Sequence, residues 1–335
     1  MFSRRHFLVL LLGLMVFVMP AGAHVPLGAE GNTNLKTAFS IDDPAKTYAI
    51  YGILENTSDA AYFKFPLKTG DRLDLSLMNA EPQSPVPDMV IISPASSTKH
   101  TNVSAIAEVP DGYDTLTIKG HIPASANYEP FTPEAMYEVA SYSEVVHTPG
   151  IYYVAVIGKA NDLHYSLASG YKEEFSPSEW VFIPVSTIST HIWEGQPILS
   201  IIAPLLAIVI LGIILISRRE NRHGSQAGAV FWLVTLAGLL YLGGAALTFV
   251  QMFRVLEITG PRSSAIVTLI FAVIPVVLGI FTLRLTRRPT HLSLRDRISL
   301  FFIAGLGFVF WAGLIIGPVC AIIAALVPDG EQNHC

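Results

Sequence analysis

The distribution of apolar positions divides the chain into two parts near residue 197. Residues 24–196 mix polar and apolar side chains, whereas residues 197–327 are mostly apolar runs separated by short basic links. A helix needs about 20 apolar residues to cross a bilayer. Four runs have this length, and each predicts a transmembrane helix: Ile198–Ser217, Ala229–Met252, Ala265–Leu283 and Ile298–Val327.

Residues 24–172 show short runs in which apolar and polar positions alternate. Tyr62–Phe65 and Leu73–Leu77 have this period of two, which is typical of a strand with one buried face. Lys68–Asp71 between them contains turn residues and predicts a tight hairpin. Seven strands are predicted in all: Tyr48–Leu54, Ala61–Leu67, Asp71–Met78, Met89–Ile92, Thr115–Lys119, Tyr152–Ile157 and Tyr165–Ala168. They predict an all-β sandwich of jelly-roll type, followed by a juxtamembrane linker, residues 173–196.

Charged residues beside the apolar runs predict the orientation of the chain. Residues 1–23 have the parts of a cleaved signal peptide: Arg4 and Arg5 at the start, an apolar core, and a small-residue site at Ala21–Ala23. The paired arginines also fit the twin-arginine motif, so both export routes stay open. The links after the first and third apolar runs are rich in arginine and are therefore predicted to be cytoplasmic. We expect a multi-pass plasma-membrane protein whose β domain and C-terminal tail, residues 328–335, are extracytoplasmic.

Composition narrows the class of protein further. Only 14% of the residues are charged and 51% are hydrophobic, so much of the chain must face lipid. In the predicted β domain, acidic residues outnumber Lys and Arg, which opposes binding to nucleic acid. Cys320 lies in a predicted helix and Cys335 is the last residue, so no disulfide is expected to stabilise the β domain.

Two segments of the β domain resemble a known family. Ala61–Leu77 is similar to the central hairpin of the bacterial pre-peptidase C-terminal domain family, and Pro149–Gly158 with Leu163–Leu167 is similar to its closing strands. The resemblance implies a jelly-roll sandwich that serves as a binding or spacer module beside an enzyme or a membrane anchor. It implies no catalytic residues. The insert from about Ser93 to Val146 departs from the family pattern and offers a place for a binding loop.

His24 is the candidate metal ligand of the sequence. Cleavage after Ala23 would make His24 the first residue, with an α-amino group and an imidazole that together suit copper. The β domain has four other histidines that could complete such a site: His100, His121, His147 and His164. None stands at a ligand-like spacing, and the alternative is that His24 merely follows the cleavage site.

Small residues in the apolar runs predict close helix contacts. Gly313 and Gly317 form a GxxxG pattern, and Gly238, Gly243 and Gly244 lie in one predicted helix. These small-residue faces serve either packing among the helices or docking onto another membrane protein.

Aromatic residues outside the membrane runs predict further contacts. Tyr128–Phe131 forms either an exposed contact surface or an anchored loop with its rings in the core. Trp193 stands just before the first apolar run, where an indole suits the membrane interface.

The sequence of the β domain contains no G-x-S-x-G, no H-E-x-x-H, no phosphate-binding loop and no cysteine nucleophile. No Asp, Glu, Lys, Arg or His lies centrally in the four apolar runs, which argues against a pump or channel. The sequence therefore favours a non-catalytic, membrane-anchored binding or accessory protein without a cofactor, which contacts lipid and could belong to a larger membrane complex. The alternative is a copper-binding or copper-handling membrane protein that uses His24.

Overall fold

The computed structural model describes residues 24–81, 85–95, 107–223, 228–286 and 292–328. The described chain forms two compact units, and each is treated by itself. The β unit ends at Ser176 and lacks only Pro130–Glu134, which belong to the helical unit together with the chain from Pro177 onward. The predicted signal peptide, residues 1–23, lies outside the described residues.

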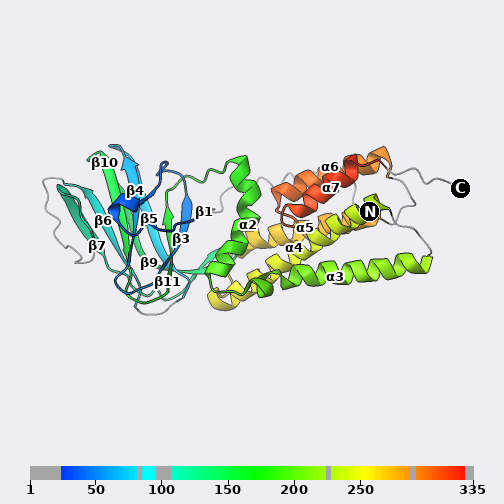
Figure 1. Ribbon diagram of the computed structural model, residues 1–335, viewed down its shortest axis with the longest axis horizontal. Helices are drawn as coiled ribbons and strands as arrows, with labels where there is room; N and C mark the ends of the chain where they lie inside the picture. Colours follow the sequence, from blue (N-terminus) through cyan, green and yellow to red (C-terminus); the bar gives the residue numbers. More distant parts are fainter. Residues whose placement is uncertain (1–23, 82–84, 96–106, 224–227, 287–291, 329–335) are drawn as a thin grey trace. The chain divides into compact units, whose positions relative to one another are not determined.

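The β unit consists of two sheets (Figure 1). Within the described residues, the first sheet has the order β1 (Val25–Gly28), β3 (Tyr48–Leu54), β11 (Leu163–Ser169), β5 (Arg72–Asn79), β9 (Glu134–Val145) and β8 (Asn127–Glu129). The second has the order β2 (Phe39–Ser40), β4 (Ala60–Leu67), β10 (Gly150–Ile157), β6 (Asp88–Pro94) and β7 (Tyr113–Ile118). A single 3₁₀ turn, η1 (Leu35–Thr37), is described beside these strands. All seven predicted strands are confirmed.

The alternation of side chains along each strand explains the core of the β unit. Alternate residues of β4, such as Phe63 and Phe65, are fully buried and join Leu75 and Leu77 of β5 in one cluster between the sheets. The opposite face of the second sheet carries another buried cluster, which includes Tyr62. The second sheet is therefore apolar on both faces.

Two features of the predicted jelly roll are wrong in detail. The sheets are mixed, because β1 pairs with β3 and β2 with β4 in parallel, whereas a jelly roll is antiparallel. The predicted turn Lys68–Asp71 forms, with Asp71 N donating to Lys68 O at 3.0 Å, but β4 and β5 lie in different sheets. The expected hairpin is therefore a crossover between sheets. A period of two identifies the buried face of a strand and leaves its neighbour undetermined.

The helical unit contains six described helices: α2 (Pro177–Trp193), α3 (Ile198–His223), α4 (Ala229–Thr259), α5 (Ala265–Leu285), α6 (Leu294–Val309) and α7 (Ile316–Leu326). In the part of the chain that the structure describes, three of them, α3, α4 and α5, are long and apolar enough to cross a membrane. They confirm helices of spanning length in the first three predicted apolar runs.

The fourth predicted transmembrane helix, Ile298–Val327, is wrong as a single span. It is divided into α6 and α7 by a turn in which Trp311, Leu314 and Ile315 take φ angles of 50°, 52° and 69°. Near the start of α6, Arg297 Nη1 donates to the carbonyl oxygens of Ala325 at 2.8 Å and Val327 at 2.6 Å, at the end of α7. The two helices are thus an antiparallel pair lying side by side (Figure 1). Hydropathy measures the apolar length of a run and does not reveal such a reversal.

Most of the predicted linker, residues 173–196, is the helix α2, which runs across the other helices of its unit (Figure 1). Its first turn is joined to the α6–α7 turn by two hydrogen bonds. Trp180 Nε1 donates to Val309 O at 3.2 Å, and Trp311 Nε1 donates to Trp180 O at 2.9 Å.

The glycines of the predicted small-residue faces are used inside the helical unit. A Cβ on Gly244 would lie 2.9 Å from Gly313 N, and one on Gly243 would lie 3.0 Å from Leu205 O. A Cβ on Gly238 would lie 3.2 Å from Gly279 O, across the contact between α4 and α5. These contacts support the first interpretation, packing among the helices.

Candidate functional site

A buried histidine at the end of α2 is the centre of the candidate site. His191 is fully buried, and its Nδ1 lies 2.9 Å from Oε2 of Glu194. The chain closes this pair locally because α2 ends at Trp193 and Gly195 takes a φ of 84°, which lets the backbone turn back. Gln196 N then donates to His191 O at 3.0 Å.

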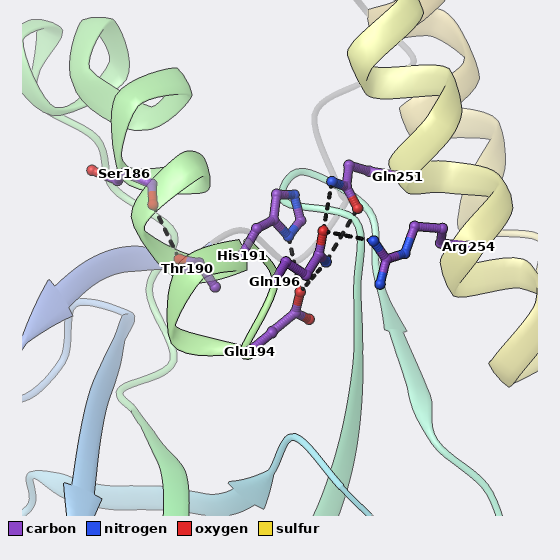
Figure 2. A network of polar contacts seen from close by, with 7 residues as sticks. All are labelled: Ser186, Thr190, His191, Glu194, Gln196, Gln251 and Arg254. Carbon is purple, nitrogen blue, oxygen red and sulfur yellow. Dashed lines mark hydrogen bonds and ion pairs between the residues drawn. The ribbon is translucent and has the colours of Figure 1, made fainter. Parts of the chain in front are cut away.

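Glu194 connects His191 to α4 through two amide side chains (Figure 2). Gln196 Nε2 donates to Glu194 Oε2 at 2.9 Å, and Gln196 Oε1 accepts from Gln251 Nε2 at 2.9 Å. Arg254 Nη1 donates to the same oxygen of Gln196 at 3.0 Å. Gln251 is almost fully buried, so this network fixes the end of α2 on α4.

The pairing with Glu194 determines which ring nitrogen of His191 carries the proton. An ionised carboxylate can only accept, so Nδ1 bears the hydrogen and, in the neutral ring, Nε2 presents a lone pair. Nε2 is buried and has no hydrogen-bond partner among the described residues. An unpaired acceptor of this kind destabilises a protein by about 1–3 kcal/mol unless something binds to it.

His191 is one of the residues that line a cavity of about 50 Å³ within the helical unit. Thr248 and Gln251 of α4, Phe271 of α5 and Trp311 of the α6–α7 turn also line it. An apolar cavity of about 150 Å³ can hold benzene. The present cavity is smaller and has room for a few water molecules or a short chain of two or three heavy atoms.

Aromatic rings form one wall of this cavity. The ring centroids of Phe271 and Trp311 are 4.7 Å apart, and those of Phe131 and Phe271 are 5.5 Å apart. Phe131 belongs to the segment Pro130–Glu134, which Thr268 holds by donating to Pro130 O at 2.6 Å. Tyr128–Phe131 was expected to be either an exposed contact surface or an anchored loop. Phe131 fits the anchored loop, because its ring packs against Phe271.

The predicted metal ligand His24 belongs to the β unit, whereas the His191 site belongs to the helical unit. Its Nδ1 is 4.0 Å from Oε2 of Glu129. Burial lowers the pKa of His24, which favours the neutral imidazole that metals bind. Among the described residues, no group of three or more His, Cys, Asp or Glu side chains could hold a metal ion, and His100 lies outside them. The copper hypothesis stays a prediction.

No protein-family model matches this chain, and no curated protein sequence matches it. The resemblance of the β domain to the pre-peptidase C-terminal domain family thus rests on its strand and turn motifs, and it also stays a prediction.

The sequence alone does not predict the His191 site. The local signal was the pair His191 and Glu194, three residues apart and directly before Gly195. A second signal was Gln251, an amide near the end of a long apolar run. Neither signal indicates that the two segments meet, because Gln196 and Gln251 are 55 residues apart in the chain.

Proposed function

We propose that this protein is a non-catalytic, membrane-anchored binding or accessory protein that presents its β-sandwich outside the cytoplasm. The observation that carries the proposal is the order of the two units: a β-sandwich with its own apolar core precedes three helices of spanning length. The surface of α3 supports the anchoring role, because Leu199, Leu211 and Leu215 are 67%, 58% and 66% exposed. Lipid is the natural cover for such a surface.

The binding role is tested by purifying the tagged, full-length protein from cross-linked cells in a mild detergent. We expect a second protein to co-purify in a stoichiometric amount, as mass spectrometry would show. Cells that express the untagged protein are the control. If only the tagged protein itself is recovered after cross-linking, the accessory-subunit role is wrong.

We also propose a topology of three spans followed by a re-entrant helix pair, α6 and α7. The pairing of Arg297 with Ala325 and Val327 supports it, because it brings the end of α7 back to the arginine-rich link before α6. That link is cytoplasmic by the positive-inside rule. α6 is about 24 Å long at 1.5 Å per residue, so the pair enters most of the bilayer without crossing it. The chain after Val327 then lies in the cytoplasm, which replaces the extracytoplasmic tail expected from four spans.

This topology predicts that Cys335 is protected in intact cells. A membrane-impermeant maleimide is expected to label it only after the membrane is opened. The Ser263→Cys variant, with Cys335 replaced by serine, is the matched control, because the α4–α5 link is placed outside and should be labelled at once. Labelling of Cys335 in intact cells would restore the four-span topology.

A further inference from the structure

We propose that the cavity beside His191 binds the hydrogen-bond-donating end of a small molecule or lipid headgroup, a hydroxyl or an amine carried on one or two carbon atoms. Nε2 of His191 is the acceptor. This inference concerns the helical unit and is independent of the binding role proposed for the sandwich.

Three polar side chains around the cavity offer acceptors: Thr187, His191 and Thr248. Thr187 Oγ1 already donates to Ile183 O at 2.9 Å, and Thr248 Oγ1 donates to Gly244 O at 3.1 Å. Each hydroxyl therefore has only lone pairs left for an occupant. His191 adds the lone pair of Nε2, which has no partner in the described chain. A ligand that satisfies these atoms must bring the hydrogens.

Two side chains that line the cavity give hydrogens to other partners. Gln251 Nε2 is bound to Gln196 Oε1 at 2.9 Å, and Thr268 Oγ1 donates to Pro130 O at 2.6 Å. Gln251 Nε2 keeps a second hydrogen, which is the one donor that these two side chains leave for an anion or a carbonyl ligand. A metal ion would need further ligands, and no such group is found among the described residues. An alcohol or an amine fits this set of atoms better than either.

The walls and the size of the cavity limit the rest of the ligand. Phe271, Pro275 and Trp311 provide apolar surface, which suits methylene groups. The volume of about 50 Å³ admits a hydroxymethyl or aminoethyl group and excludes an aromatic ring.

The α6–α7 turn contributes strained backbone to the cavity wall, which is common where a ligand is bound. Trp311 and Leu314 line the cavity and have positive φ angles of 50° and 52°. Residues with side chains rarely hold this conformation unless their surroundings enforce it. Here the packing of Trp311 against Phe271 and its hydrogen bond to Trp180 O enforce it.

The experiment uses the full-length protein, labelled with ¹⁵N-histidine and stripped of lipid in detergent. The His191 Nε2 resonance is assigned by its loss in the His191→Phe variant. Ethanol and ethanolamine test a free small molecule. Phosphatidylglycerol and phosphatidylethanolamine, which have donor headgroups, test a lipid. Phosphatidylcholine, whose headgroup has no donor, is the control lipid.

We expect the Nε2 resonance to shift in a saturable way with at least one donor compound and to stay unchanged with phosphatidylcholine. A response to the two lipids alone identifies a headgroup, and a response to ethanol or ethanolamine alone identifies a free molecule. Native mass spectrometry then measures how tightly the His191→Phe variant binds the same compound. We expect its affinity to be at least about tenfold lower, as for one lost hydrogen bond.

Two further variants separate the ligand from the fold. Thr248→Leu fills the cavity while keeping His191, so we expect the shift to be lost in a protein that still folds. His147→Gln, a change at an exposed histidine of the β unit, should leave the shift unchanged. An Nε2 resonance that is protonated, or that responds to none of the five compounds, overturns the proposal and leaves water as the occupant.

Discussion

Replacing Gly52 by alanine is expected to destabilise the β unit by about 3 kcal/mol, at the upper end of the usual effect of overpacking a core. Gly52 of β3 pairs directly with Tyr165 of β11, and the tyrosine ring covers the glycine. A Cβ on Gly52 would lie 2.8 Å from Cε1 of Tyr165 and closer still to the end of the ring. Tyr165 is 1% exposed and packed in the core, so its ring cannot move aside without opening the space between the sheets.

The full-length protein is unfolded by heating in detergent. The near-ultraviolet circular dichroism of its tyrosines monitors the transition. A loss of this size should lower the midpoint of the β-unit transition by about 6–12 °C. Gly28→Ala in the neighbouring strand β1 is the matched control, because no described atom lies within 4 Å of the added Cβ. Equal midpoints for the two variants would show that Tyr165 does not pack over Gly52.

Seven of the described strands could be predicted from the sequence because each has buried apolar positions on at least one face. β5 shows this clearly, since its buried and partly buried residues alternate along the whole strand. β9 was missed because its pairing with β5 shifts register between Leu77 and Met78, and the C-terminal half of β9 is mostly exposed. The partner of a strand depends on contacts far away in the chain, which is why the β4–β5 hairpin was predicted wrongly.

The helices could be predicted for a similar reason, since apolar length is a local property. The reversal between α6 and α7 depends on the packing of Trp311 and Gly313, and both residues fit an uninterrupted apolar run. The candidate site was harder still, because His191 acquires its role only when α2 lies against α4. No local pattern contains that contact.

Replacing Gly244 by alanine is expected to destabilise the helical unit by about 3 kcal/mol, because two backbones touch at this residue. The added Cβ would lie 2.9 Å from the nitrogen and 3.2 Å from the Cα of Gly313. Backbone atoms cannot rotate away as a side chain can, so the α6–α7 turn must move off α4. Trp311 is in this turn, and its contacts with Trp180 and Phe271 would loosen together.

Tryptophan fluorescence during heating in detergent measures this effect, because Trp180 and Trp311 report on the turn directly. Gly305→Ala in α6 is the matched control: no described atom lies within 4 Å of its added Cβ, and alanine favours a helix over glycine by up to about 1 kcal/mol. We therefore expect the first variant to unfold several degrees lower and the second to unfold at the original temperature or slightly above it.

Because Gly244 also lines the cavity, the first variant should weaken the response of His191 Nε2 to its ligand. If both variants unfold at the same temperature, the α6–α7 turn does not pack on α4. The re-entrant topology would then lose the support of the Gly244–Gly313 contact.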